Sequence, residues 1–312
     1  MAYNVRMAPS ANDGLVGIRV GKDDRIVVVR LIGEGGSGSI YLGRDEGRQR
    51  DVALKFLHDT YASNETLLTR FMREGRRFGK LEHPNLVKVY GWGQKGGRLF
   101  IVSEYVDGLN LYQLLQMRGS LSMERALGIC RDTAAGLAEA HRNDIVHRDL
   151  KPENVMLRNQ DNVVKVLDFG IAKDLRDTRL DLTGLGMYIG TPAYSSPEQI
   201  RGEGVDHRSD IFSLGVILYE LLTGRVAFDG RHSTEVLRST LRDEPRPVTD
   251  LNRLVTAPAA HLIETMIKKK PDRRFQSMLE VMAEIEELMD VAESVSERDE
   301  ITVRHSLKEL FE

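Results

Sequence analysis

The chain lacks most of the features that mark specialised classes of protein. Cys130 is its only cysteine, which excludes an intramolecular disulfide and a thiolate metal cage and fits a reducing cytoplasm. The formal net charge is only −3, so the bulk charge does not point to nucleic acid. The longest apolar stretch, Ile211 to Leu222, is too short to span a bilayer, and residues 1–20 lack the pattern of a signal peptide. We expect a soluble cytoplasmic protein and leave open a membrane anchor in a longer parent chain.

The chain does have enough apolar material for a large core. Hydrophobic residues make up 41 % and charged residues 29 % of its 312 residues, without an internal repeat or a low-complexity tract. Strand patterns dominate the first third and helical patterns follow Gly108, which predicts an α+β fold of two lobes with a cleft between them. The expected divisions are a flexible extension over 1–24, a small β-rich lobe over 25–106, a larger, mainly α-helical lobe over 107–290 and an acid-rich tail over 291–312.

Local patterns predict the individual elements. Segments rich in valine and isoleucine predict strands, with Lys95-Gly96-Gly97 as a hairpin turn. Apolar residues at helical spacing predict helices, one of them capped by Ser122. Strands are expected at 25–33, 39–44, 51–57, 86–92, 98–104, 145–146, 155–157 and 163–167, and helices at about 64–80, at 121–143 and from Asp206 onward.

A glycine-rich segment carries the first chemical signal. Gly33, Gly35 and Gly38 have the spacing G-x-G-x-x-G, which lets a backbone approach phosphates closely. A plain glycine-rich hairpin turn explains the spacing equally well. The segment lies between two strands rather than before a helix, which disfavours a dinucleotide-binding fold and favours a loop folded over ATP.

Lys55 lies on an apolar strand, where a charged side chain is costly unless it meets a negative partner. Substrate phosphates, or Glu74 on the following helix, would provide that partner. A lysine at a sheet edge that reaches solvent is the alternative.

Two carboxylates and an amide follow in short loops. Asp149 and Asn154 are close in sequence, and Asp168 comes next in Asp168-Phe169-Gly170. Oxygen donors gathered in one cleft suit Mg²⁺ shared with phosphates, with Lys151 near the transferred group. Each carboxylate taken singly would read as a surface charge or a helix cap, but their joint order is specific.

These motifs together resemble the eukaryotic-like (Hanks-type) serine/threonine protein kinases, especially the bacterial ones, over residues 25 to 290. The resemblance implies a bilobal kinase fold and the activity of a non-specific serine/threonine protein kinase that uses ATP. The matching residues are the glycine loop, Lys55, Glu74, His147-Arg148-Asp149, Asn154, Asp168-Phe169-Gly170, Ser196-Pro197-Glu198, Asp210 and Arg274.

The resemblance also implies a role for each catalytic position. Asp149 would accept or orient the proton of the substrate hydroxyl, and Lys151 would neutralise charge on the phosphoryl group in transit. Asn154 and Asp168 would hold Mg²⁺, with Mn²⁺ as a substitute. Lys55, held by Glu74, would bind the α- and β-phosphates. The implied adenine pocket consists of Ile32, Ile40, Ala53 and Met156, with Ser103 behind the base and the backbone of Glu104 to Val106 as the hinge.

Further positions bear on the substrate and on control. Lys151 and Thr191 favour serine or threonine in protein substrates over tyrosine, and the Pro-Glu segment ending at Glu198 disfavours a small-molecule kinase. Arg148 would receive a phosphate on Thr183, or else on Thr178, added by autophosphorylation between two copies in a homodimer. These threonines could equally be ordinary polar loop residues. Phe78, Val89, His147 and Phe169 would stack above Asp210, Glu198 would pair with Arg274, and retention of the catalytic set disfavours a pseudokinase.

Overall fold

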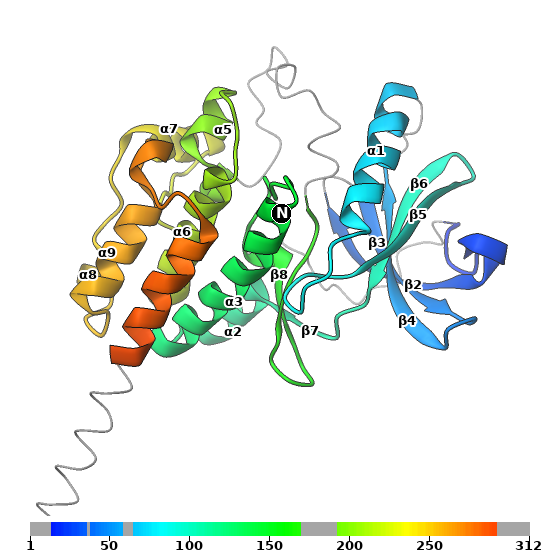
Figure 1. Cartoon of the computed structure of the whole chain (residues 1–312), viewed down its shortest axis with the longest axis horizontal. Coiled ribbons are helices and arrows are strands. Elements are labelled where there is room, and N and C mark those ends of the chain that lie inside the picture. Colours follow the sequence, from blue (N-terminus) through cyan, green and yellow to red (C-terminus); the bar gives the residue numbers. More distant parts are fainter. Residues whose placement is uncertain (1–13, 36–37, 59–64, 170–191, 292–312) are drawn as a thin grey trace, which may run out of the picture.

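The computed structural model describes residues 14–35, 38–58, 65–169 and 192–291. These residues form two lobes, a β-sheet with one helix beside it and a larger lobe built mostly of helices (Figure 1). The sequence prediction of an α+β bilobal fold is therefore confirmed. Within the described ranges, no helix has both the length and the apolar character needed to cross a membrane.

The small lobe is one antiparallel sheet with strand order β1-β2-β3-β4-β6-β5. Alternation along the sequence decides its two faces: Val52, Leu54 and Phe56 are buried on one face, and Lys55 points to the other. Gly96 and Gly97 close the predicted hairpin with positive φ of 56° and 80°. The strands are β1 (Arg19–Val20), β2 (Ile26–Gly35), β3 (Gly38–Asp45), β4 (Arg50–Leu57), β5 (Val89–Lys95) and β6 (Arg98–Glu104).

The first strand lies inside the segment that the sequence suggested to be a flexible extension. Val20 is completely buried, and the Gly17 N–H donates to the Val28 carbonyl at 2.8 Å. A short 3₁₀ turn over Lys22–Asp24 then leads into β2. The described part of this segment is thus packed on the sheet, because burial of Val20 and backbone bonding to β2 hold it there.

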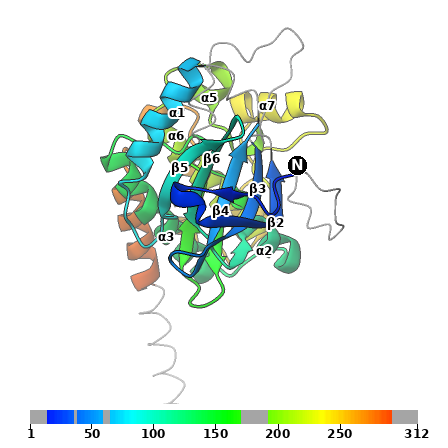
Figure 2. The same cartoon turned by 90° about the vertical axis from the view of Figure 1, so that its right-hand side faces the viewer.

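The helix α1 (Glu65–Phe78) accompanies the sheet and lies beside β5 in both views (Figure 1 and Figure 2). Phe71 and Phe78 are buried and join the main core of the molecule. This matches the helix expected at about 64–80, since the apolar residues recur at helical spacing.

The large lobe surrounds the buried helix α6 (Arg208–Thr223), which contains the apolar stretch noted in the sequence. A small sheet with order β7-β8-β9 lies on the side of the large lobe toward the small lobe (Figure 1). Its strands are β7 (Gly108–Asn110), β8 (Val155–Arg158) and β9 (Val164–Val166). The other helices are α2 (Leu111–Arg118), α3 (Met123–Arg142), α5 (Pro197–Arg201), α7 (Ser233–Arg242), α8 (Val248–Leu251), α9 (Ala257–Met266) and one over 278–291, with 3₁₀ turns at Pro152–Asn154, Pro192–Tyr194 and Pro271–Arg273.

Helix α3 begins and ends close to where the sequence predicted. The Ser122 hydroxyl accepts the Arg125 N–H as its N-cap, and Cys130 lies on the buried face. Burial raises the pKa of the Cys130 thiol. The strand expected at 145–146 is wrong: the Ile145 N–H instead donates to the Ala140 carbonyl and closes the end of α3. The strands expected at 155–157 and 163–167 are confirmed as β8 and β9.

Candidate functional site

The loop from His147 to Asn154 is held by a buried carboxylate on α6. Asp210 Oδ2 accepts the His147 N–H at 2.8 Å, and Oδ1 accepts the Arg148 N–H at 2.9 Å. The His141 Nε2–H also donates to Asp210 Oδ2 at 2.8 Å. Burial alone would raise the pKa of Asp210, but the hydrogen bond and charge of His141 outweigh it and the pKa is lowered. Asp210 is therefore charged and fixes the backbone of the loop.

His147 links this loop to the segment that carries Asp168. Its Nδ1 accepts the Asp149 N–H at 3.2 Å, so the ring proton sits on Nε2, which donates to the Leu167 carbonyl at 2.8 Å. Burial lowers the pKa of His147, which keeps the ring neutral. The ring of Phe169 lies 4.8 Å from His147 and 5.4 Å from Phe78, as the sequence predicted. Val89, the fourth predicted member, packs against the same core.

The loop side chains converge on one point. Asn154 Nδ2 donates to the Asp149 carbonyl at 2.8 Å, and Lys151 Nζ lies 3.6 Å from Asp149 Oδ2. Asn154 is buried, whereas the carboxylate of Asp149 and the amine of Lys151 remain partly exposed. Arg148 has a φ of 61°, a left-handed conformation that few residues other than glycine adopt. Such a backbone is kept only where its surroundings impose it.

Lys55 and Asp168 join the two lobes. Lys55 Nζ on β4 lies 2.9 Å from Asp168 Oδ2, just beyond β9. Asp168 also has a left-handed backbone, with φ of 52°. The Leu167 N–H donates to the Asn154 carbonyl at 2.8 Å and so ties the two loops together. The side chain of Glu74, the other predicted partner of Lys55, lies outside the described part of the structure.

Asn154 and Asp168 fit the requirements of a hard divalent cation. Because the amide nitrogen of Asn154 is engaged with the Asp149 carbonyl, its Oδ1 is the atom that can coordinate a metal. A carboxylate and an amide oxygen are the donors that Mg²⁺ prefers. These two residues could therefore hold such an ion between the loops.

The strands of the small lobe bring the predicted nucleotide-binding residues together. Ile40 pairs with Lys55 across β3 and β4, and Ala53 pairs with Ser103 across β4 and β6. A Cβ atom on Gly38 would lie 1.9 Å from the Phe56 carbonyl oxygen, so only glycine fits there. Gly33 and Gly35 lie on β2 next to the register shift at Ile32, while residues 36 and 37 lie outside the described part.

The predicted hinge follows β6. The Glu104 N–H donates to the Lys88 carbonyl at 2.8 Å, so Glu104 can offer only its carbonyl to a base. The Glu104 carboxylate is 3.0 Å from Lys165 Nζ and 3.5 Å from Arg158 Nη1, and no sequence motif indicated these contacts. Val106 follows as a buried residue, and Met156 is a partly buried residue of β8.

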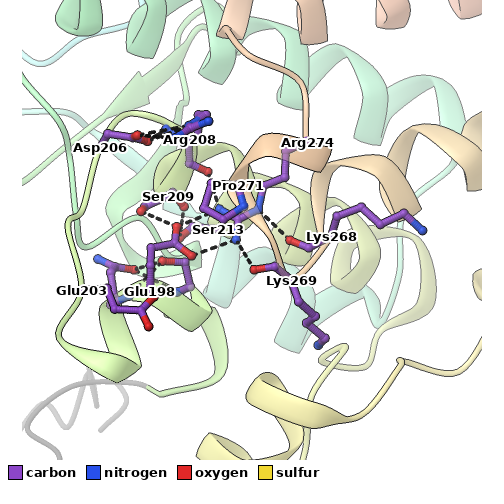
Figure 3. A network of polar contacts seen from close by, with 12 residues as sticks. Glu198, Glu203, Asp206, Arg208, Ser209, Ser213, Lys268, Lys269, Pro271 and Arg274 are labelled. Carbon is purple, nitrogen blue, oxygen red and sulfur yellow. Dashed lines mark hydrogen bonds and ion pairs between the residues drawn. The ribbon is translucent and has the colours of Figure 1, made fainter.

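The segment that begins at Pro192 contacts the loop from His147 to Asn154. Arg274 pairs with Glu198 as predicted, and this buried pair belongs to a network of polar contacts (Figure 3). Gln199 Nε2 donates to the Arg148 carbonyl at 2.8 Å, and the Tyr194 hydroxyl donates to Glu220 Oε2 at 2.6 Å. Sequence reasoning missed both contacts. A small pocket between the two segments is lined by Asp149, Lys151, Tyr194 and Ser195, among others, while Thr191, Thr183 and Thr178 lie outside the described residues.

A family model, the protein kinase domain, matches residues 26–286. The chain belongs to the protein kinase family. The predicted resemblance is thereby confirmed.

Two relatives of this protein kinase chain come from bacteria. It is 39 % identical over 266 residues to serine/threonine-protein kinase PknB of Mycolicibacterium smegmatis and 36 % identical over 276 residues to PrkC of Bacillus subtilis. These matches cover 84 % and 88 % of this chain but only 42 % of each relative. The crystal structure of the PknI kinase domain from Mycobacterium tuberculosis matches with a TM-score of 0.69 and 27 % identity, covering 87 % of this chain and 99 % of that chain.

Proposed function

We propose that the chain transfers the γ-phosphate of ATP to serine and threonine hydroxyls of protein substrates. The observation that carries this proposal is the meeting of Lys55 from the small lobe with Asp168, beside the loop of Asp149 and Asn154. Membership of the kinase family and similarity to proteins named serine/threonine-protein kinases support the same function. Phosphoryl transfer demands positioning and electrostatic stabilisation, which this arrangement can supply without a nucleophilic side chain.

On the acceptor side, Asp149 takes or orients the proton of the substrate hydroxyl. Its carboxylate is partly exposed and borders the pocket next to Tyr194 and Ser195, where a hydroxyl can approach. Lys151, with its amine 3.6 Å from Asp149, neutralises charge on the phosphoryl group in transit.

On the donor side, Lys55 binds the α- and β-phosphates, and Glu74 holds the lysine in place. Asn154 and Asp168 hold Mg²⁺, for which Mn²⁺ can substitute. When bound, the cation neutralises phosphate charge. Ile32, Ile40, Ala53 and Met156 enclose the adenine, and the Glu104 carbonyl and Val106 N–H bond its edge, while the glycines of β2 and β3 cover the phosphates.

The test is transfer of labelled phosphate from ATP to a generic basic protein in the presence of Mg²⁺. Wild type is expected to yield phosphoserine and phosphothreonine, and Asp149→Asn is expected to yield neither. Asp290→Asn, which removes an exposed carboxylate on the last helix, serves as the control with wild-type activity. Equal signal from wild type and Asp149→Asn contradicts the proposal, and nucleotide binding without transfer by wild type would make the chain a binding module.

We further propose that the enzyme acts in the cytoplasm on protein substrates and phosphorylates its own activation segment, the stretch from Asp168 to Glu198, in a transient homodimer. The left-handed Arg148, whose backbone is held by Asp210 and Gln199, is the expected receiver of that phosphate. The rate of autophosphorylation per molecule should rise with enzyme concentration. A rate per molecule that does not depend on concentration would mean that the reaction occurs within one chain.

A further inference from the structure

Trp92 on β5 sits in a notch on α1 made by two glycines. A Cβ atom on Gly75 would lie 2.7 Å from Cδ2 and 3.0 Å from Cγ of the Trp92 ring. A Cβ atom on Gly79, just past the end of α1, would lie 3.0 Å from Cζ3 of the same ring. The indole is half-buried and packs against the main core. It therefore rests directly on the backbone of α1.

The contact with Trp92 explains why a glycine lies inside α1. Glycine inside a helix is less favourable than alanine, because it loses more backbone freedom on folding. Gly128 inside α3 has open space where a Cβ would be, so alanine would fit there. Gly75 is buried and has no such space, since the ring of Trp92 fills it. The indole thus fixes how closely α1 approaches β5.

Helix α1 also contacts residues of the large lobe. The ring of Phe78, in its last turn, lies 5.4 Å from Phe169, and Arg77 Nη2 donates to the Asp144 carbonyl at 3.1 Å. Phe169 directly follows Asp168, whose carboxylate meets Lys55. Close-packed aromatic contacts transmit small shifts, so a displacement of α1 would move Phe169 and the carboxylate beside it.

We propose that Trp92 is a positioning residue for phosphotransfer: by filling the Gly75–Gly79 notch it sets the distance of α1 from β5 and, through Phe78 and Phe169, the placement of Asp168. The inference rests on the proposed function for its kinetic consequence. Its structural part concerns the single tryptophan of the chain, whose fluorescence reports on the notch whether or not the protein transfers phosphate.

The decisive variant is Gly75→Ala in the full chain, with Gly128→Ala as the matched helical glycine control. Gly75→Ala should lower kcat about tenfold while the KM for a peptide substrate stays unchanged, because only the placement of catalytic groups is altered. Its Trp92 emission should shift to longer wavelength as the ring is pushed toward solvent. Gly128→Ala should keep wild-type kcat and emission.

A second variant relieves the clash. In Gly75→Ala combined with Trp92→Leu, the smaller side chain leaves room for the new methyl group, and kcat should recover most of the loss. Thermal unfolding is measured for each protein. Wild-type kcat and emission in Gly75→Ala would overturn the inference, and so would a loss of kcat accompanied by unfolding at the assay temperature. A wild type without phosphotransfer, but with the emission shift in Gly75→Ala, would instead overturn the proposed function and the kinetic part while keeping the notch contact.

Discussion

Arg274 and Glu198 form a two-pronged ion pair, with Nη1 2.8 Å from Oε1 and Nη2 2.8 Å from Oε2. Both side chains are buried, and Ser209 donates a further hydrogen bond to Oε1 at 2.6 Å. The pair ties α5 to the turn before the last helix (Figure 3). Paired and fully hydrogen-bonded, these charges can be buried, but neither tolerates loss of the other.

Removing one partner of this pair should therefore destabilise the fold strongly. Arg274→Leu is expected to lower the free energy of unfolding by about 3–5 kcal/mol, because Glu198 is left buried without its charge partner. Urea denaturation followed by circular dichroism measures the change. Arg19→Leu is the control, since its pair with Glu46 is half exposed and should matter little. A small effect of Arg274→Leu would mean that Glu198 finds other partners.

The same pair predicts how the stability of the protein changes at acid pH. Burial works to raise the pKa of Glu198, but the hydrogen bonds and charge of Arg274 outweigh it, and the pKa lies below the ordinary 4.5. A carboxyl group with a lowered folded pKa contributes stability above its unfolded pKa and loses it as the pH falls through the folded value. Wild type should therefore exceed Glu198→Gln in stability near neutral pH, and this difference should shrink below pH 4.5. A difference that does not vary with pH would contradict this.

Lys269 leads to a prediction about the stability of the protein at alkaline pH. Its Nζ lies 3.7 Å from the centre of the Phe228 ring and donates to the Thr240 carbonyl at 2.9 Å, and burial lowers its pKa from 10.5 to about 8. Between these values the unfolded chain binds more protons than the folded one, so stability should rise with pH. Lys269→Met should lose this rise, and the exposed Lys270→Met should keep it. Denaturant titrations from neutral pH upward decide the point.

Ser103 leads to a prediction about the adenine analogues that the nucleotide site accepts. It is a small, partly exposed residue on β6 opposite Ala53, just before the hinge. A small side chain there should leave space behind the adenine. Adenine analogues with bulky N6 groups should bind wild type and be blocked in Ser103→Met, as measured by competition with ATP. Equal affinity in both proteins would show that the space is closed by other residues.

Thr183 is the expected autophosphorylation site. Thr183→Ala should reduce activity and remove phosphate from the activation segment, because Arg148 would lose the group that it binds. Mass spectrometry of the active enzyme is the measurement, with Thr178→Ala as the comparison variant. An active enzyme without phosphate between Asp168 and Thr191 would rule this out.

Much of the arrangement could be predicted because its signals are local or carried by motifs. The strands of the small lobe follow from alternation, and α3 follows from helical spacing and its Ser122 cap. The buried pair of Glu198 and Arg274, far apart in the sequence, could be placed only through the family resemblance. The expected strand at 145–146 failed because Ile145 enters the core just after the end of α3. A short apolar run at the end of a helix cannot be distinguished from a strand by its sequence alone.

Other contacts gave no signal in the sequence. His141 reads as one more residue on the buried stripe of α3, yet its ring binds Asp210. The notch around Trp92 depends on two glycines, because neither has a side chain that would collide with the indole. From the sequence alone, a glycine inside a helix indicates only a lower helix propensity. The strand β1 is too short for any periodic pattern. Such features depend on tertiary packing, which local propensity does not encode.

The burial of Cys130 gives the protein a practical property. The only thiol of the chain lies on the buried face of α3, and its pKa is raised. It should therefore react slowly with maleimides or iodoacetamide. A cysteine introduced on the surface of each lobe would then accept a fluorophore or spin label against an almost silent background. The distance between the two labels could be followed as nucleotide is added, without first removing the natural residue.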